Sequence, residues 1–132
     1  MTQEQKDLLL KDLCARLPYD VKVNCNDKVY NFNGIQYFNI CTLTDDNENN
    51  AFTTAGIKYI KPYLFPLSSM TEEQGKELEK IDPEFYSLIC ENGDIYISMD
   101  VRGYDWLNKN HFDYRGLIPM GLAIDATGLK IY

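Results

Sequence analysis

The spacing of hydrophobic residues changes at Pro18, and this change constrains the fold more than any other feature of the sequence. Before Pro18, residues such as Leu9 and Leu13 recur at the spacing of an amphipathic helix. Thr2 and Gln5 form the capping-box pattern that starts such a helix. Its apolar face is expected to include Cys14 as well, and its solvated face is expected to carry Lys6, Asp7, Lys11 and Asp12. After Pro18, hydrophobic and polar residues alternate, as they do in half-buried strands. We therefore expect an N-terminal helix followed by a sheet.

The alternating region divides into short segments separated by turn residues. Strands are predicted at residues 21–25, 29–32, 35–43 and 51–60. Asn33-Gly34 suits the positive backbone angles of a type I′ turn, so we expect a hairpin there. Consecutive short strands predict a small, curved antiparallel sheet, and closure into an SH3-like barrel is one form that this sheet could take.

The second half of the sequence favours helices. Pro62 and Pro66 predict an extended connector, after which capping boxes at Ser69 and Thr71 compete to start a helix that runs toward Lys80. Later elements are expected as a helix after Asp82, a strand at 95–99, a short helix capped by Asp105 and an ordered, apolar C-terminal segment. The predicted fold class is α+β, in one domain over residues 1–132 that is sheet-rich at 19–60 and helix-rich at 67–115.

Charge and cysteine content narrow the function classes. The formal net charge is −7, and residues 67–132 hold twelve acidic against six basic side chains. Such a chain is repelled by phosphate backbones, so we do not expect direct nucleic-acid binding. The four cysteines form no CxxC pair, no apolar run is long enough to cross a membrane, and no secretory signal opens the chain. We expect a cytoplasmic protein with free thiols, and neither a metal site nor a cofactor.

The segment 106–115 is where a function is most expected. It contains the one histidine, His111, with Asp113 two residues later, which is a weak candidate for a catalytic pair. It also contains residue types that often anchor protein interfaces, so the predicted interaction residues are Trp106, His111, Tyr114 and Arg115. Alternatively, the aromatic residues fill the core while Asp113 and Arg115 pair with each other. Tyr114 and Arg115 are expected to be the more exposed.

Three stretches of the chain resemble a family of uncharacterised small proteins from gut Bacteroidales genomes, prophages and mobile elements. They are QEQKDLLLKDLCARLPYDVKV at 3–23, IKPYLFPLSSMTEEQ at 60–74 and DWLNKNHFDYRGLIPMGLAIDA at 105–126. Many proteins of that family have a second histidine where Asn110 stands here, so the resemblance implies no two-histidine metal site. It implies an intracellular accessory protein of a bacterium or phage, without an assigned activity.

Three hypotheses about function follow. The leading one is a noncatalytic protein-interaction module that binds a protein partner. The second is an acidic inhibitor that mimics nucleic acid, and the third is a small enzyme centred on His111. The carboxylates of the second hypothesis would be Glu72, Glu73, Glu77, Glu79, Asp82 and Glu84. A solvated helix face explains the same acids, because Lys76 and Lys80 lie among them.

Overall fold

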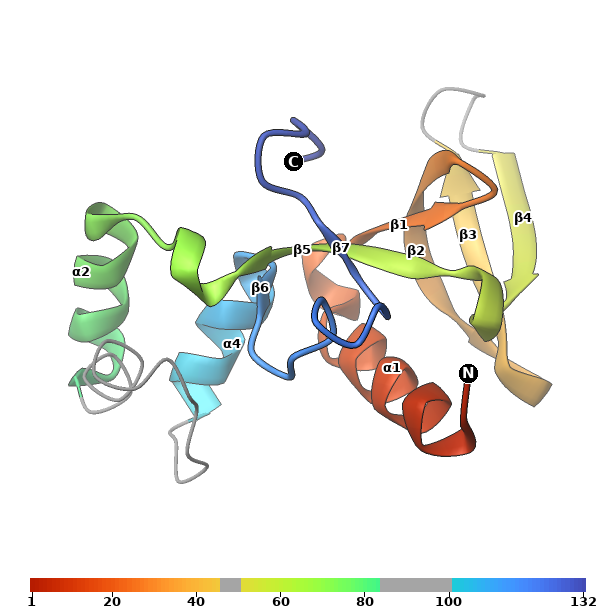
Figure 1. Cartoon of the computed structure of the whole chain (residues 1–132), viewed down its shortest axis with the longest axis horizontal. Coiled ribbons are helices and arrows are strands. Elements are labelled where there is room, and N and C mark those ends of the chain that lie inside the picture. Colours follow the sequence, from red (N-terminus) through yellow and green to blue (C-terminus); the bar gives the residue numbers. More distant parts are fainter. Residues whose placement is uncertain (46–50, 84–100) are drawn as a thin grey trace.

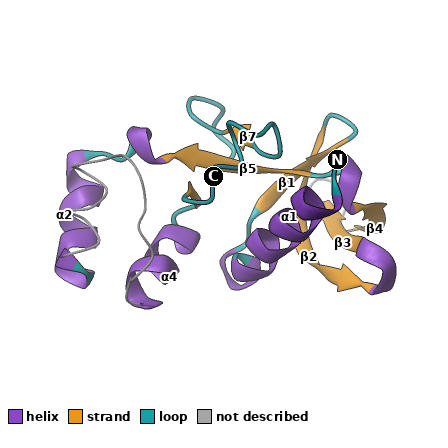
Figure 2. Cartoon of the chain, turned by 60° about the horizontal axis from the view of Figure 1, so that its bottom comes forward, coloured by secondary structure: helices purple, strands orange, loops and turns teal. Residues whose placement is uncertain are grey.

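The computed structural model describes residues 1–45, 51–83 and 101–132, and it confirms the α+β class (Figure 1). The described helices are α1 (Gln3–Ala15), α2 (Glu72–Ile81) and α4 (Val101–Lys109). The described strands are β1 (Lys22–Cys25), β2 (Lys28–Gln36), β3 (Ile40–Asp45), β4 (Ala51–Gly56), β5 (Lys61–Pro66), β6 (Phe112–Asp113) and β7 (Ile124–Asp125). Figure 2 shows α2 and α4 at one end of β5, and α1 with β1 to β4 at the other.

The predicted capping box of α1 is present. The Thr2 hydroxyl accepts from the Gln5 amide, and the Gln5 side chain accepts from the Thr2 amide. The buried face of the helix holds Leu9 and Leu13, as expected, and also Asp12. Asp12 had been assigned to the solvated face, and this assignment was wrong. Asp12 lies three residues after Leu9 and therefore on the same side of the helix.

The seven strands form one open, mixed sheet with the order β4-β3-β2-β1-β5-β6, and β7 pairs with β5. Neighbouring strands are antiparallel in the part of the sheet with the order β4-β3-β2-β1-β5. β5 pairs in parallel with both β6 and β7. The antiparallel sheet predicted for residues 19–60 is therefore present as β1 to β4, and the parallel pairs involve strands outside that region. The described strands do not close into a barrel, because β4 and β6 lie at opposite ends of the sheet.

The hairpin predicted at Asn33-Gly34 was wrong, because β2 runs through both residues. Gly34 has a φ of 151°, and the register between β2 and β3 shifts between Phe32 and Gly34, so the glycine forms an irregularity within the strand. The tight turn lies instead at Asn26 and Asp27, whose positive φ values of 52° and 62° join β1 to β2. Asparagine and aspartate tolerate this conformation better than most other residues, so either dipeptide was suited to the turn.

The segment predicted as a connector is β5, a strand at the centre of the fold. Each proline lies in a short pairing of two residues, Pro62 opposite Val23 of β1 and Pro66 opposite Asp113 of β6. Such short pairings tolerate the missing N–H donor of proline. Alternate side chains of a strand point to opposite faces. Leu64 accordingly joins the hydrophobic core formed by α1 and β1 to β3, whereas Phe65 packs against the second core, which contains Leu78, Trp106, Leu107 and Phe112. β5 thus connects the two cores.

The helices after β5 differ from expectation in their starting points. Thr71 caps α2 through a capping box with Gln74, whereas Ser69 ends the preceding short turn and donates to the carbonyl of Pro66. Asp105 lies inside α4 instead of capping it. The helix predicted after Asp82 and the strand predicted at 95–99 fall mainly or wholly outside the described residues.

Candidate binding site

A fully buried ion pair lies at the C-terminal end of α1, and its arginine is hydrogen-bonded to β6. Asp12 and Arg16 lie one helical turn apart, and neither side chain is exposed. Arg16 donates from Nε to Asp12 Oδ2 at 2.8 Å and from Nη2 to Asp12 Oδ1 at 3.1 Å. Nη2 also donates to the carbonyl oxygen of Phe112 at 2.6 Å. Because buried charges are costly unless they are paired and hydrogen-bonded, these bonds fix α1 against β6.

The guanidinium of Arg115 binds the same carboxylate. Its Nε donates to Asp12 Oδ1 at 3.2 Å, and its Nη2 donates to the Tyr114 hydroxyl at 3.0 Å. That hydroxyl donates to Asn108 Oδ1 at 2.8 Å. Burial raises the pKa of Tyr114, so the hydroxyl keeps the proton that it donates. The guanidinium carbons of Arg16 and Arg115 lie 5.3 and 4.7 Å from the centre of the Tyr114 ring, within cation–π range.

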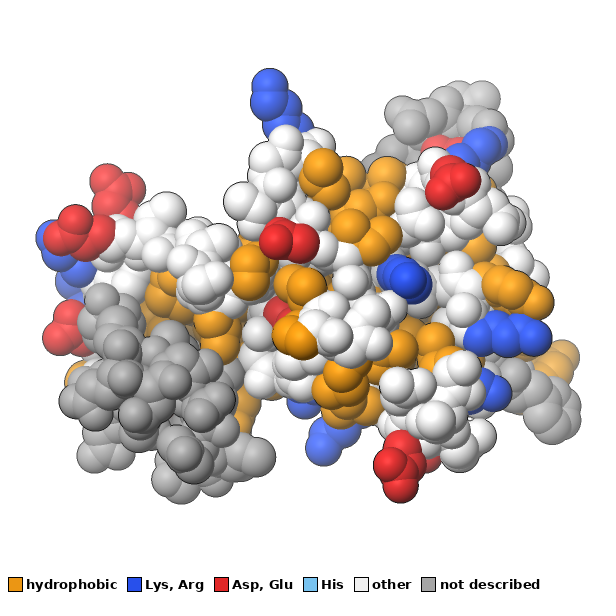
Figure 3. All heavy atoms as spheres, in the orientation of Figure 1, with side chains coloured by type: hydrophobic (Ala, Val, Ile, Leu, Met, Phe, Trp, Pro, Cys, Tyr) orange, Lys and Arg blue, Asp and Glu red, His pale blue; other side chains and the backbone are white. Residues whose placement is uncertain are grey.

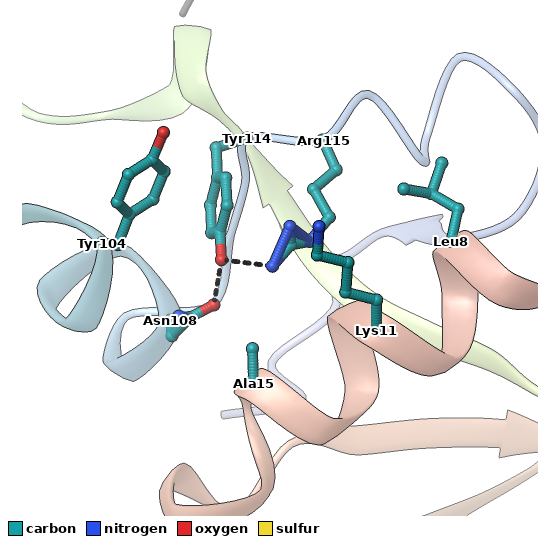
Figure 4. A pocket seen from close by; sticks show the side chains of 7 residues that line it. All are labelled: Leu8, Lys11, Ala15, Tyr104, Asn108, Tyr114 and Arg115. Carbon is teal, nitrogen blue, oxygen red and sulfur yellow. Dashed lines mark hydrogen bonds between the residues drawn. The ribbon is translucent and has the colours of Figure 1, made fainter. Parts of the chain in front are cut away.

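These groups border an open pocket of about 580 Å³ between α1 and α4. Its lining residues are Leu8, Lys11, Ala15, Tyr104, Asn108, Tyr114 and Arg115 (Figure 4). The rings of Tyr104 and Tyr114 lie 5.2 Å apart and are tilted by 56°, so they form an aromatic wall. Lys11 enters the lining from α1 and Arg115 from the segment after β6 (Figure 4). The pocket therefore combines apolar surface with two cationic side chains, a composition suited to binding a ligand.

The electrostatics of this pocket are opposite to those of the whole chain. Three cationic side chains, Lys11, Arg16 and Arg115, surround or lie behind the pocket, and one buried carboxylate, Asp12, is paired with two of them. Three positive charges and one negative charge leave an excess of two positive charges. The whole chain has a formal net charge of −7. This local excess favours an anionic or electron-rich group in the pocket.

Of the four predicted interaction residues, Tyr114 and Arg115 line the pocket and Trp106 does not. Trp106 is 5% exposed and stacks on Phe112, with ring centres 5.7 Å apart. Its indole nitrogen donates to Glu77 Oε1 at 3.0 Å, which connects α4 to α2. Trp106 is therefore a core residue, as the alternative interpretation had it.

His111 is also buried and does not line the pocket. Its ring stacks on that of Tyr132, with centres 3.7 Å apart and planes 11° from parallel. Burial, and then the positive charges of Arg16 and Lys22, lower the pKa of His111 to about 4. The imidazole is therefore neutral at pH 7. Its Nδ1 has no hydrogen-bond partner within the described part of the chain.

Asp113 has a structural role. Its two carboxylate oxygens accept from the amides of Leu117 and Ile118, each at 2.9 Å, which fixes the loop after β6. Within the described residues no hydrogen bond connects Asp113 to His111, so the candidate catalytic pair is not assembled. The expected pairing of Asp113 with Arg115 was also wrong, because Arg115 binds Asp12.

Sequence reasoning missed five polar or aromatic residues of the site: Lys11, Asp12, Arg16, Tyr104 and Asn108. Two of them had a readable signal. Asp12 and Arg16 have the spacing of a helical ion pair, and both continue the buried stripe of Leu9 and Leu13. Such a stripe predicts a buried pair and not a solvated face.

The two buried cysteines of the described residues, Cys25 and Cys41, show no sign of reactivity. Cys14, Cys25 and Cys41 are free thiols. Burial raises the pKa of Cys25 and raises that of Cys41 to about 11, so neither is a thiolate at pH 7. Cys14 was expected on the apolar face of α1 but is exposed. Cys90 lies outside the described residues.

Acidic side chains gather at the end of the molecule that carries α2, with lysines beside them (Figure 3). Lys76 Nζ lies 3.7 Å from Glu72 Oε1 in a pair that is largely exposed. This arrangement is typical of a solvated helix face. Glu84, the sixth acid of the mimicry hypothesis, lies outside the described residues.

Similarity to known proteins does not assign a family or a function to this chain. Comparison with protein-family models, curated proteins and solved structures gives no match to this chain. Within residues 1–45, 51–83 and 101–132, no group of three or more His, Cys, Asp or Glu side chains is placed to hold a metal ion. In the same residues, no helix has the length and apolar character required to span a membrane. Function must therefore be inferred from the pocket itself.

Proposed function

We propose that this chain is a noncatalytic protein-interaction module and that a protein partner docks in the pocket between α1 and α4. One observation carries the proposal: Tyr114 and Arg115 line an open pocket and are held in place by buried groups behind them. Asp12 and Asn108 fix the Arg115 guanidinium and the Tyr114 hydroxyl through the bonds described above. Side chains fixed before binding lose little entropy when a partner docks, which favours affinity.

The chemistry of the lining favours binding over catalysis. The seven residues that line the pocket include no histidine, carboxylate or cysteine to act as a base or nucleophile. His111, the centre of the enzyme hypothesis, is stacked against Tyr132 and lies away from this lining. Aromatic and arginine side chains in one pocket are typical of interface anchors.

We further propose a cytoplasmic location, in an accessory protein of a phage or mobile element. The free thiols of Cys14, Cys25 and Cys41 support a reducing compartment. The accessory role rests only on the resemblance of the segments 3–23, 60–74 and 105–126 to the Bacteroidales family.

A steric block tests the docking proposal independently of the partner's chemistry. Ala15→Trp would fill the pocket from α1, and Thr54→Trp would place the same side chain on the exposed surface of β4. Each tagged variant would be used to capture proteins from a lysate of the source organism, and the recovered partner would then be purified and titrated by calorimetry.

The proposal predicts a partner that binds the wild type and Thr54→Trp with equal affinity and Ala15→Trp at least tenfold more weakly. Circular dichroism would establish that both variants are folded. Equal binding by all three proteins would refute docking in this pocket, and the absence of any saturable partner would refute the interaction function.

A further inference from the structure

The polar atoms available in the pocket are hydrogen-bond donors. An arginine side chain has five N–H groups. In Arg115, one N–H of Nε and one of Nη2 are used, for Asp12 and Tyr114, and three remain. Lys11 adds an ammonium group for which no acceptor is found in the described residues. A ligand for this pocket must therefore supply acceptors.

Two acceptors of the lining, the Tyr114 hydroxyl and Asn108 Oδ1, are already engaged. The Tyr114 hydroxyl accepts from Arg115 and donates its proton to Asn108 Oδ1. Asn108 is 5% exposed, and within the described residues its amide Nδ2 donates to no acceptor. This nitrogen is not one of the side-chain atoms that are shielded from solvent without a partner, so it remains accessible to a ligand at the wall of the pocket. It matches the donor excess of Lys11 and Arg115.

The charge and shape of the pocket limit the chemical class of ligand that it can bind. The excess of two positive charges favours an anion, and a guanidinium with free N–H groups suits a carboxylate. The remaining lining is apolar: Leu8 and Ala15 on α1, and the rings of Tyr104 and Tyr114 opposite. A pocket of about 580 Å³ has room for a carboxylate together with an adjacent hydrophobic side chain.

We infer that the pocket recognises a short acidic segment of the partner, with a glutamate or aspartate carboxylate on Lys11, Arg115 and Asn108. A neighbouring aliphatic residue of the partner lies on Leu8, Ala15 and the two tyrosine rings. This inference rests on the proposed function and specifies the chemistry of the docked segment.

Two peptides, blocked at both ends, test the inference directly. The probe is acetyl-Gly-Glu-Leu-Gly-amide, and the control is the same peptide with Gln in place of Glu. Binding to the full chain would be followed by NMR, through the side-chain Nε–H of Arg115 and the side-chain amide of Asn108. Inorganic phosphate would be titrated in the same way. Lys11→Glu would remove a lining cation, and Lys58→Glu would make the same charge change outside this pocket.

The expected result is saturable movement of both resonances, with the glutamate peptide binding about tenfold more tightly than the glutamine peptide. Added salt weakens that binding, because the attraction is between charges. Lys11→Glu abolishes the preference and Lys58→Glu leaves it intact. Equal binding of the two peptides overturns the inference, as does phosphate binding more tightly than the glutamate peptide. If Ala15→Trp still excludes the partner in that case, docking in the pocket stands and only its acidic chemistry is wrong.

Discussion

The stacked His111 makes the stability of the fold depend on pH in a predictable direction. The folded pKa is about 4, and the ordinary value is 6.5. Between these pH values the unfolded chain takes up a proton on His111 and the folded chain does not. Falling pH therefore favours unfolding, and the stabilisation is complete only above pH 6.5.

The magnitude follows from the separation of the two pKa values. One pKa unit corresponds to about 1.4 kcal/mol, so the full loss below pH 4 is about 3 kcal/mol. Between pH 7.5 and pH 5 the loss is about 2 kcal/mol, since the unfolded imidazole is almost fully protonated at pH 5. A loss of 2 kcal/mol is a substantial part of the stability of a small domain.

Urea unfolding at a series of pH values would measure this loss, with His111→Asn as the control. His111 has a φ of 62°, and asparagine tolerates this left-handed conformation while lacking the titrating ring. The unfolding free energy of the wild type minus that of His111→Asn should fall by about 2 kcal/mol from pH 7.5 to pH 5. Subtraction of the two curves removes the contribution of the carboxylates, which both proteins share.

The pKa of the His111 imidazole can also be measured directly, by NMR. His111 is the one histidine of the chain, so its ring resonance needs no assignment experiment. A titration midpoint near pH 6.5 in the folded protein, or parallel stability curves for the wild type and His111→Asn, would refute the reasoning. Replacement of Tyr132 by alanine should raise the pKa of His111, because it removes the ring that covers the imidazole.

Three further substitutions test other parts of the structure. Asp12→Asn should lower the unfolding free energy in urea by about 3–5 kcal/mol, because it leaves the buried Arg16 without a counter-charge; a loss below about 1 kcal/mol would contradict this. Asp27→Gly should raise the free energy of unfolding by about 1 kcal/mol, since glycine adopts the φ of 62° without strain, and an unchanged or lower melting temperature would argue against the turn. Thr71→Ala should cost about 1 kcal/mol and speed amide exchange in the first turn of α2, and unaltered exchange there would count against the cap.

Local features of this fold were predictable from the sequence, and features that depend on distant partners were not. The capping box at Thr2 involves residues three apart, and it forms as expected. At Thr71 the same local pattern identified the helix, but the choice between Thr71 and Ser69 depends on the turn that follows β5. The dipeptides Asn26-Asp27 and Asn33-Gly34 have similar local preferences for a tight turn, but only the second was predicted, because the choice depends on strand pairing.

The role of β5 could not be predicted because it arises from pairing with remote strands. A segment with Pro62 and Pro66 has a poor strand sequence. It becomes a strand because β6 and β7, from the other end of the chain, pair with it. Hydrophobic contacts on both of its faces then outweigh the weak local preference.

Only part of the candidate site was predicted, because the rest of it also depends on contacts between distant segments. The residue types of Tyr114 and Arg115 mark them as interface anchors wherever they lie. Lys11 and Asn108 become relevant only when α1 and α4 meet, and the bond from Arg115 to Asp12 spans 103 positions of the sequence. Tryptophan is also a residue type that often anchors interfaces, but Trp106 is buried where α4 contacts α2.

The most direct test of docking in the pocket is site-specific photo-cross-linking in living cells. A photoreactive phenylalanine derivative would replace Cys14, which is exposed on α1 beside the lining residue Ala15, and in a second strain Lys58, which is exposed elsewhere. Irradiation should produce one discrete protein adduct at position 14, absent at position 58 and lost when Ala15→Trp is added. The same adducts at both positions, or an adduct at position 14 that persists with Ala15→Trp, would contradict the account.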